Sequence, residues 1–360
     1  MRIILCSFRI TFFSVFISIL FMPSFVLAAG CLNVVIVNNF AYGACGNAIE
    51  VIELETLERN EVNVQADDIA ADTDASLIFV QSGSTLTVLN IENPFNPVVV
   101  DVVNTNFSFF SGLSAANGVL VVSAGAGSAN TQVFTYSLSS NDIGSLTLTT
   151  NGIPLIDNAV GNPDVHLTET DNGAIAFYSQ DIGAVANFAI QAVTLSTSGQ
   201  VLNIDDDVVL TPGAFNFGLG LGAANFPVES EFLDSRLYVA HFAAQGVEVI
   251  DISDDKRLLP VIPLSYEPTN ITTDGELLFV VGPTNSTVDV IDPISLTVVD
   301  NLNADQPLNQ ALGVAASKTH IAIADGIDGL ITITRPVSDV EPELCFPVKT
   351  DSDDVVIVCL

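Results

Sequence analysis

Carboxylates are the most abundant groups in this sequence that are able to do chemistry. The 360-residue chain carries 42 Asp and Glu residues against nine Lys and Arg, a formal net charge of −33. Carboxylate oxygens are the ligands that Ca²⁺ prefers, although acids are also common in the turns between strands. No group of acids has the spacing of a helix–loop–helix calcium loop. The sequence therefore leaves two interpretations of the acids open, calcium ligands and residues of turns. The crowded acids are Asp67-Asp68, Asp205-Asp206-Asp207, Asp254-Asp255 and Asp353-Asp354.

The charge excludes one class of partner. A chain this acidic is repelled by the phosphates of nucleic acids, so we expect no nucleic-acid binding. An acidic solubilising surface and an attraction for Ca²⁺ or other cations are both compatible with the composition.

The residues needed for common catalytic sites are sparse. The three histidines, His166, His241 and His320, are not paired in sequence, and each lies in or beside a strand-like segment of a different part of the chain. No Gly-x-Ser-x-Gly elbow or Walker loop occurs, and Trp is absent. The sequence therefore favours a protein without enzymatic activity.

The N-terminus resembles a targeting segment. Arg2 and Arg9 precede an apolar run over 10–22, and small residues follow at Ala28 and Ala29. This layout predicts a signal peptide over 1–29 and a mature chain over 30–360, secreted or periplasmic and without a transmembrane segment. Two alternatives stay open: a retained membrane anchor, and a lipoprotein in which the sequence LAAGC is a lipobox and Cys31 carries the lipid.

Strand-like segments recur along the rest of the chain about every 47 residues. A period of 40–50 residues is typical of propeller blades, and no long segment after the leader has the apolar period of a helix. Each segment follows another apolar strand and a short polar hairpin, so we predict an all-β, seven-bladed β-propeller with four antiparallel strands per blade. Two β-sandwich domains joined near 211–227 are the competing fold. The repeated segments are 49–54, 86–91, 133–138, 190–195, 247–252, 288–292 and 330–334.

Three repeats resemble known families. Residues 86–102 read LTVLNIENPFNPVVVDV, with Asn-Pro turns at 93–97 between the predicted third and outermost strands of blade 2. This unit and 246–264 resemble the LVIVD-type repeat, and 287–302 resembles the YVTN-type repeat. The resemblance implies an exported propeller that binds an unknown protein or small ligand at its mouth, as a binding or scaffold module at or outside the cell surface. Two alternatives are a Ca²⁺-dependent hydrolase of the lactonase-like propeller type and a structural component of a surface layer.

Functional sites in propellers usually lie where the innermost strands begin. The repeat register places one such position in each blade, and we predict that the acids and the amide among them bind a metal ion. The loose resemblance to lactonase-type propellers implies Ca²⁺. The predicted metal ligands are Asp68, Asp164, Glu229, Asn270 and Asp354, and Gly112 and Gly313 occupy the other two positions.

The two ends of the chain are predicted to close blade 1 together. Residues 32–37 match the second strand of a blade, so the surplus strand 353–360 is expected to lie innermost beside them. This arrangement predicts disulfides between Cys31 and Cys359 and between Cys45 and Cys345. The rival connectivity joins Cys31 to Cys45 and Cys345 to Cys359.

Overall fold

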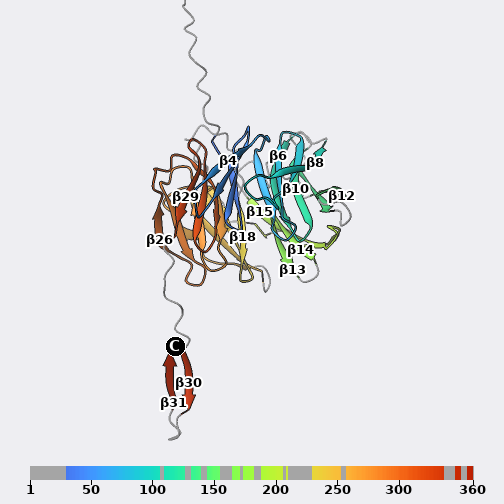
Figure 1. Ribbon diagram of the computed structural model, residues 1–360. Helices are drawn as coiled ribbons and strands as arrows, with labels where there is room; N and C mark the ends of the chain where they lie inside the picture. The colour runs from blue at the N-terminus through green and yellow to red at the C-terminus, as the bar shows by residue number, and fades with distance from the viewer. Residues whose placement is uncertain are drawn as a thin grey trace, which may run out of the picture.

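The structure is a computed structural model, shown in Figure 1. In the part of the chain that it describes, the regular secondary structure is β-strand apart from one short 3-10 turn, η2 (Phe242–Ala244). No helix in this part has the length and the apolar character needed to span a membrane. The predicted all-β class is confirmed. The described residues are 30–105, 109–125, 131–138, 144–154, 164–170, 173–181, 188–205, 208–209, 229–252, 257–335, 345–349 and 355–359.

The first three blades are four-stranded antiparallel sheets in sequence order. Blade 1 contains β1 (Asn33–Val37), β2 (Phe40–Ala44), β3 (Ile49–Glu53) and β4 (Arg59–Val62). Blade 2 contains β5 (Asp68–Asp72), β6 (Leu77–Ser82), β7 (Thr85–Asn90) and β8 (Val98–Asn104). Blade 3 contains β9 (Phe109–Ala116), β10 (Val119–Gly125), β11 (Thr131–Leu138) and β12 (Leu146–Pro154).

The next two blades have an outer strand in two pieces, each paired with the third strand. Blade 4 contains β13 (Asp164–Thr170), β14 (Gly173–Asp181), β15 (Phe188–Ser196), β16 (Val201–Ile204) and β17 (Val208–Val209). Blade 5 contains β18 (Ser230–Leu233), β19 (Arg236–His241), β20 (Gly246–Asp251), β21 (Arg257–Leu258) and β22 (Ile262–Pro263).

Blade 6 is again four-stranded, whereas blade 7 has three strands among the described residues. Blade 6 contains β23 (Asn270–Thr273), β24 (Leu278–Val281), β25 (Thr287–Asp292) and β26 (Thr297–Asn303). Blade 7 contains β27 (Ala311–Ala316), β28 (His320–Asp325) and β29 (Gly329–Thr334).

The first strands of the seven blades contact one another in a closed cycle, with β27 against β1, so the blades form a ring. Each of the seven apolar core clusters lies between two consecutive blades. Both faces of a blade are therefore buried, which explains why the middle strands are continuous apolar runs, such as β6, rather than alternating ones. The seven-bladed prediction is confirmed.

The Asn-Pro turns lie between β7 and β8, as predicted, and they contact the neighbouring blade. The Tyr42 hydroxyl donates to the Pro94 carbonyl at 3.0 Å, and the Asn60 amide donates to the Phe95 carbonyl at 2.7 Å. The Phe40 and Phe95 rings are 6.4 Å apart. Proline fixes the turn without requiring a backbone N–H, which leaves the carbonyls free to join blade 2 to blade 1.

The predicted closure of the ring is wrong. Residues 33–37 form β1, the innermost strand of blade 1, and its second strand is β2, which follows a tight turn with Asn38 at φ 54°. The C-terminal strand β31 (Val355–Cys359) instead pairs with β30 (Cys345–Lys349), and this hairpin lies away from the ring in Figure 1. The prediction failed because the two-residue turn at Asn38-Asn39 was not recognised.

The preferred disulfide connectivity is also wrong. Cys31 is bonded to Cys45, so the predicted Cys31–Cys359 and Cys45–Cys345 bridges are not formed. The β1–β2 hairpin explains the outcome, because Asn33 pairs with Ala44 and the two cysteines flank that pair. In the C-terminal hairpin, Cys345 and Cys359 are direct cross-strand partners, as the rival connectivity requires.

Candidate functional site in the central channel

The first strands of all seven blades line a central channel. Its volume is about 340 Å³, within the range of small-ligand sites. The described residues that line it include His166, Glu229 and Glu231 as titratable groups, and they include no Lys or Arg. The channel thus combines a ligand-sized space with an acidic lining.

The repeat register located the inner strands correctly in blades 2 to 7. Asp68, Asp164 and Asn270 are the first residues of β5, β13 and β23, and Glu229 immediately precedes β18. Gly112 lies in β9 and Gly313 in β27, whereas Asp354 lies outside the described residues. In blade 1 the corresponding position belongs to Asn33, which the sequence argument missed because it assigned that blade to the C-terminus.

Several of these polar groups are hydrogen-bonded to inner strands. Asn33 donates to Asp68 at 2.7 Å, and each side chain also accepts the N–H of the residue that follows it. Asn270 accepts the N–H of Val314, which joins blade 6 to blade 7. Burial raises the pKa of the Asp68 carboxyl to about 6, and the hydrogen bonds from Asn33 and Ile69 oppose this shift. These bonds satisfy backbone donors at the free edge of the inner strands.

A second polar layer lies two residues further along the inner strands. It consists of Ser114, His166, Glu231 and Thr272, which follow Gly112, Asp164, Glu229 and Asn270 at a spacing of two. Side chains at this spacing share one face of a strand, so the same register predicts both layers. In the sequence VESE, residues 228–231, glutamates occupy alternate positions, and this alternation predicts that Glu231 lies on the same face as Glu229.

The centre of the second layer is a contact between blades 4 and 5. His166 Nε2 lies 3.6 Å from Glu231 Oε1. Burial lowers the pKa of His166 to about 4. Burial raises the pKa of Glu231 to about 7, opposed by hydrogen bonds from the Phe232 and Thr273 N–H groups and from the Thr272 side chain. Near neutral pH the histidine is uncharged, and Glu231 is poised between its two protonation states.

The binding of calcium by the predicted ligands at the starts of the inner strands remains a prediction. In the described part of the chain, three metal-ligating atoms come within 4.8 Å of one another only at Cys31, Cys45 and Glu50, and both cysteines belong to the disulfide. This statement concerns His, Cys, Asp and Glu, and it does not extend to the amide of Asn270 or to the side chain of Asp164.

Buried acids elsewhere fit the interpretation as structural turns. Asp325 is fully buried, and its carboxylate accepts four backbone N–H groups, from Asn309, Gln310, Ile327 and Asp328. Asp72 accepts the N–H groups of Ala75 and Gly118 and so links blade 2 to blade 3. The histidines are likewise dispersed: His241 contacts Glu248 in blade 5 and His320 contacts Thr319 in blade 7.

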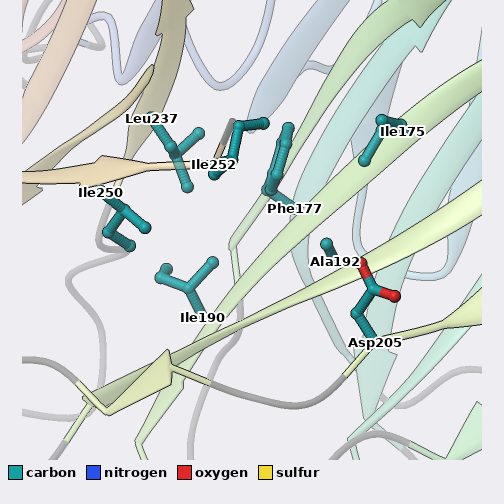
Figure 2. A pocket seen from close by; sticks show the side chains of 8 residues that line it. All are labelled: Ile175, Phe177, Ile190, Ala192, Asp205, Leu237, Ile250 and Ile252. Carbon is teal, nitrogen blue, oxygen red and sulfur yellow. The ribbon is translucent and has the colours of Figure 1, made fainter. Parts of the chain in front are cut away.

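A second, smaller cavity lies between blades 4 and 5 (Figure 2). Its volume is about 110 Å³, and apolar side chains surround it, with the carboxylate of Asp205 at one end in the figure. The described lining residues are Ile175, Phe177, Ile190, Ala192, Asp205, Leu237, Ile250 and Ile252.

Comparison with known proteins supports the fold. No family model matches the chain, and no curated protein matches its sequence. Among solved structures, the chain is similar to Saccharomyces cerevisiae Sqt1 (10% identity, TM-score 0.57, covering 86% of this chain and 97% of that one). It is similar to hydrazine synthase of Kuenenia stuttgartiensis (12%, 0.60, 86% and 97%) and to the WD40 β-propeller domain of Doa1 (10%, 0.56, 86% and 94%). At these identities the likeness concerns the fold alone, and this chain has a seven-bladed, WD40-like β-propeller fold.

Proposed function

We propose that the protein is an exported binding module, related to the LVIVD and YVTN repeat propellers, that takes a cationic ligand or a cationic group of a partner into its central channel. The observation that carries this proposal is the channel itself, with Glu229 and Glu231 and without Lys or Arg among its described lining residues. The net charge of −33 adds a field that attracts cations toward every opening of the ring.

The histidine in the channel supports binding rather than catalysis. An efficient general base has a pKa near the working pH, and His166, with its pKa lowered to about 4, is a weak base at neutral pH. Its described partner is Glu231 rather than a nucleophilic hydroxyl or thiol.

The disulfide supports soluble export over lipidation. Lipidation of Cys31 would use the same sulfur atom that is bonded to Cys45, and Cys31 is fully buried. The signal peptide over 1–29 lies outside the described residues. The intact mass of the exported protein tests this point: cleavage after Ala28 or Ala29 without an adduct is expected, and a diacylglyceryl group on Cys31 contradicts it.

Calorimetric titration of the mature protein tests the channel. We expect 1,4-diaminobutane to bind more tightly than the uncharged 1,4-butanediol, and more tightly at pH 8 than at pH 6, because Glu231 loses its proton near pH 7. The variant Glu231→Gln is expected to weaken diamine binding at least tenfold, while the exposed Glu92→Gln serves as the matched control. Equal binding of the two probes, or no binding of either, contradicts the proposal.

The Ca²⁺-dependent, lactonase-like alternative is favoured by one observation, namely that Asp68, Asp164 and Asn270 do begin inner strands. If a calcium ion binds there, millimolar Ca²⁺ raises the unfolding temperature more than NaCl of equal ionic strength, since only a ligand of the native state adds binding free energy. The variant Asp68→Asn should remove that difference. Equal shifts from both salts indicate screening of the acidic surface and reject the alternative.

A further inference from the structure

Blade 7 is the blade that lacks an outer strand in the described part of the chain. In each of the other six blades the third strand pairs with at least one further strand, whereas β29 pairs only with β28. An unpaired strand edge presents a row of backbone N–H and C=O groups that is a template for another strand.

Part of this edge is already occupied by blade 1. The N–H of Leu330 donates to Glu50 at 3.0 Å, and the Arg59 guanidinium donates to the Leu330 carbonyl at 3.0 Å. In an antiparallel sheet, every second residue of a strand points its N–H and C=O toward the same edge. Thr332 therefore presents these groups on the edge that Leu330 also faces. The open part of the edge therefore begins after Leu330 and extends to Thr334.

We propose that this open edge of β29 is the docking site of the chain's own C-terminal hairpin, with β31 as the fourth strand of blade 7 and β30 outside it. The connection is long enough. Ten residues, 335–344, join β29 to β30, and they span up to about 33–36 Å when extended, more than the ~20 Å length of a six-residue strand. The connector can thus return along the blade and leave β31 antiparallel to β29.

The composition of the hairpin selects β31 as the docking strand. β30 contains Pro347, which has no N–H to donate, and Lys349, and both residue types are typical of a strand at the outer edge of a sheet. β31 reads VVIVC and has neither. Its β-branched residues suit a strand that is paired on both sides.

The hairpin of the same chain is a better occupant than that of a second copy. A short tether gives an intramolecular strand a high effective concentration, in the millimolar range for flexible linkers. Two copies also repel each other, because each carries a formal charge of −33.

Hydrogen exchange of the full mature chain tests the proposal, with the peptide that covers 329–334 as the readout. The variant Ile357→Pro breaks β31 and is expected to speed exchange in this peptide at least tenfold, while Pro347→Ala in β30 changes it less than twofold. Exchange in β25 and β26 of blade 6 should stay unchanged in both variants, which shows that the ring is folded.

Three outcomes overturn the assignment. Unchanged exchange in Ile357→Pro means that the hairpin does not dock. Slower exchange in Pro347→Ala means that β30 rather than β31 faces β29. Protection that rises with protein concentration, together with a dimer in size-exclusion chromatography, means that the hairpin comes from a second copy.

Discussion

Two interfaces of the ring differ in the contacts that hold them together. One joins blades 7 and 1, and the other joins blades 4 and 5. The first packs ten buried apolar residues and adds polar links, with the Cys31 N–H donating to the Asp325 carbonyl and Arg59 and Glu50 bonded to Leu330. The second packs five buried apolar residues among those described, and it borders the cavity of Figure 2.

Chain connectivity distinguishes the two interfaces. Blades 4 and 5 follow each other along the chain, so a loosening of their contact still leaves them tethered. Blades 7 and 1 lie at opposite ends of the ring sequence, and only non-covalent contacts keep them together, because the Cys31–Cys45 bond lies within blade 1. Their contact must offset the entropy of closing a loop of about 300 residues. Among the described residues it has the larger buried apolar cluster of the two.

The largest expected effect comes from removing the disulfide beside the closure. The double variant Cys31→Ala and Cys45→Ala is expected to lose about 3 kcal/mol of unfolding free energy, because the bond closes a loop of 14 residues in sequence separation. Urea unfolding measures the loss. The matched pair Cys345→Ala and Cys359→Ala lies in the C-terminal hairpin rather than at the contact between blades 7 and 1, and it should cost the ring little. An equal loss from both pairs would contradict the special role of the closure.

Replacement of a buried alanine by leucine should change the stability of the protein in opposite directions at the two interfaces. Ala324 is fully buried between blades 7 and 1, so Ala324→Leu is expected to cost about 1–3 kcal/mol by overpacking. Ala192 borders the cavity between blades 4 and 5, so Ala192→Leu is expected to stabilise the protein by about 1 kcal/mol. Thermal unfolding of the two variants decides the matter, and destabilisation by both would show that the cavity is not available to a side chain.

A smaller effect is expected from the polar link across the closure. Arg59→Met leaves the Leu330 carbonyl without that donor and removes the ion-pair partner of Glu50, which keeps its hydrogen bond from the Leu330 N–H. The expected cost is about 1–2 kcal/mol. Lys318→Met is the control. Lys318 pairs with the exposed Glu276 at 2.8 Å and lies 3.9 Å from Asp274, which keeps Arg335 as a partner, and a surface pair of this kind contributes about 0–1 kcal/mol. If the two variants lose the same stability, Arg59 adds nothing beyond a surface charge.

The interface between blades 4 and 5 should also respond to pH through His166 and Glu231. Because the folded pKa of Glu231 is raised, its contribution is greatest below its unfolded pKa and is lost as pH rises toward 7. Because the folded pKa of His166 is lowered, its contribution is present above its unfolded pKa and is lost as pH falls toward 4. The two effects oppose each other between about pH 4.5 and 6.5.

Glu231→Gln separates the two contributions. Relative to the parent protein, this variant should become more stable as pH rises from about 4.5 to 7, by about 1 kcal/mol or more, because each unit of pKa shift corresponds to about 1.4 kcal/mol. Unfolding temperatures of both proteins at pH 5 and pH 8 provide the comparison. A constant difference across this range would show that the Glu231 carboxyl is not perturbed in the folded protein.

Local sequence patterns were sufficient to predict the number of blades and the positions of most of their strands. Apolar strands such as 86–91 recur with similar hairpins, and their burial on both faces explains why the pattern stayed legible. The starts of the inner strands followed from the same repeat, including Asp68 and Asn270, since a period of two residues carries the register along each strand.

Closure and long-range contacts were not predictable in this way. The wrong strand assignment at 32–37 depended on one missed turn at Asn38. It led to the wrong pairing of the cysteines and to the choice of Asp354 instead of Asn33 as the channel residue of blade 1. The pairing of His166 with Glu231 joins segments 65 residues apart, and nothing in either segment names the other. Such contacts depend on how neighbouring blades meet, which the repeat of a single blade does not encode.

The Cys31–Cys45 bond also determines how the ring would bear a mechanical load. A force that pulls on the chain at Gly30 enters the molecule at Cys31 and passes through the sulfur atoms to Cys45. The residues between the two cysteines, which include β1 with its place in the channel wall, are bypassed and carry no tension. A propeller held by its N-terminal end would therefore keep β1 in the channel wall while it is pulled, and reduction of this one bond would put β1 under tension.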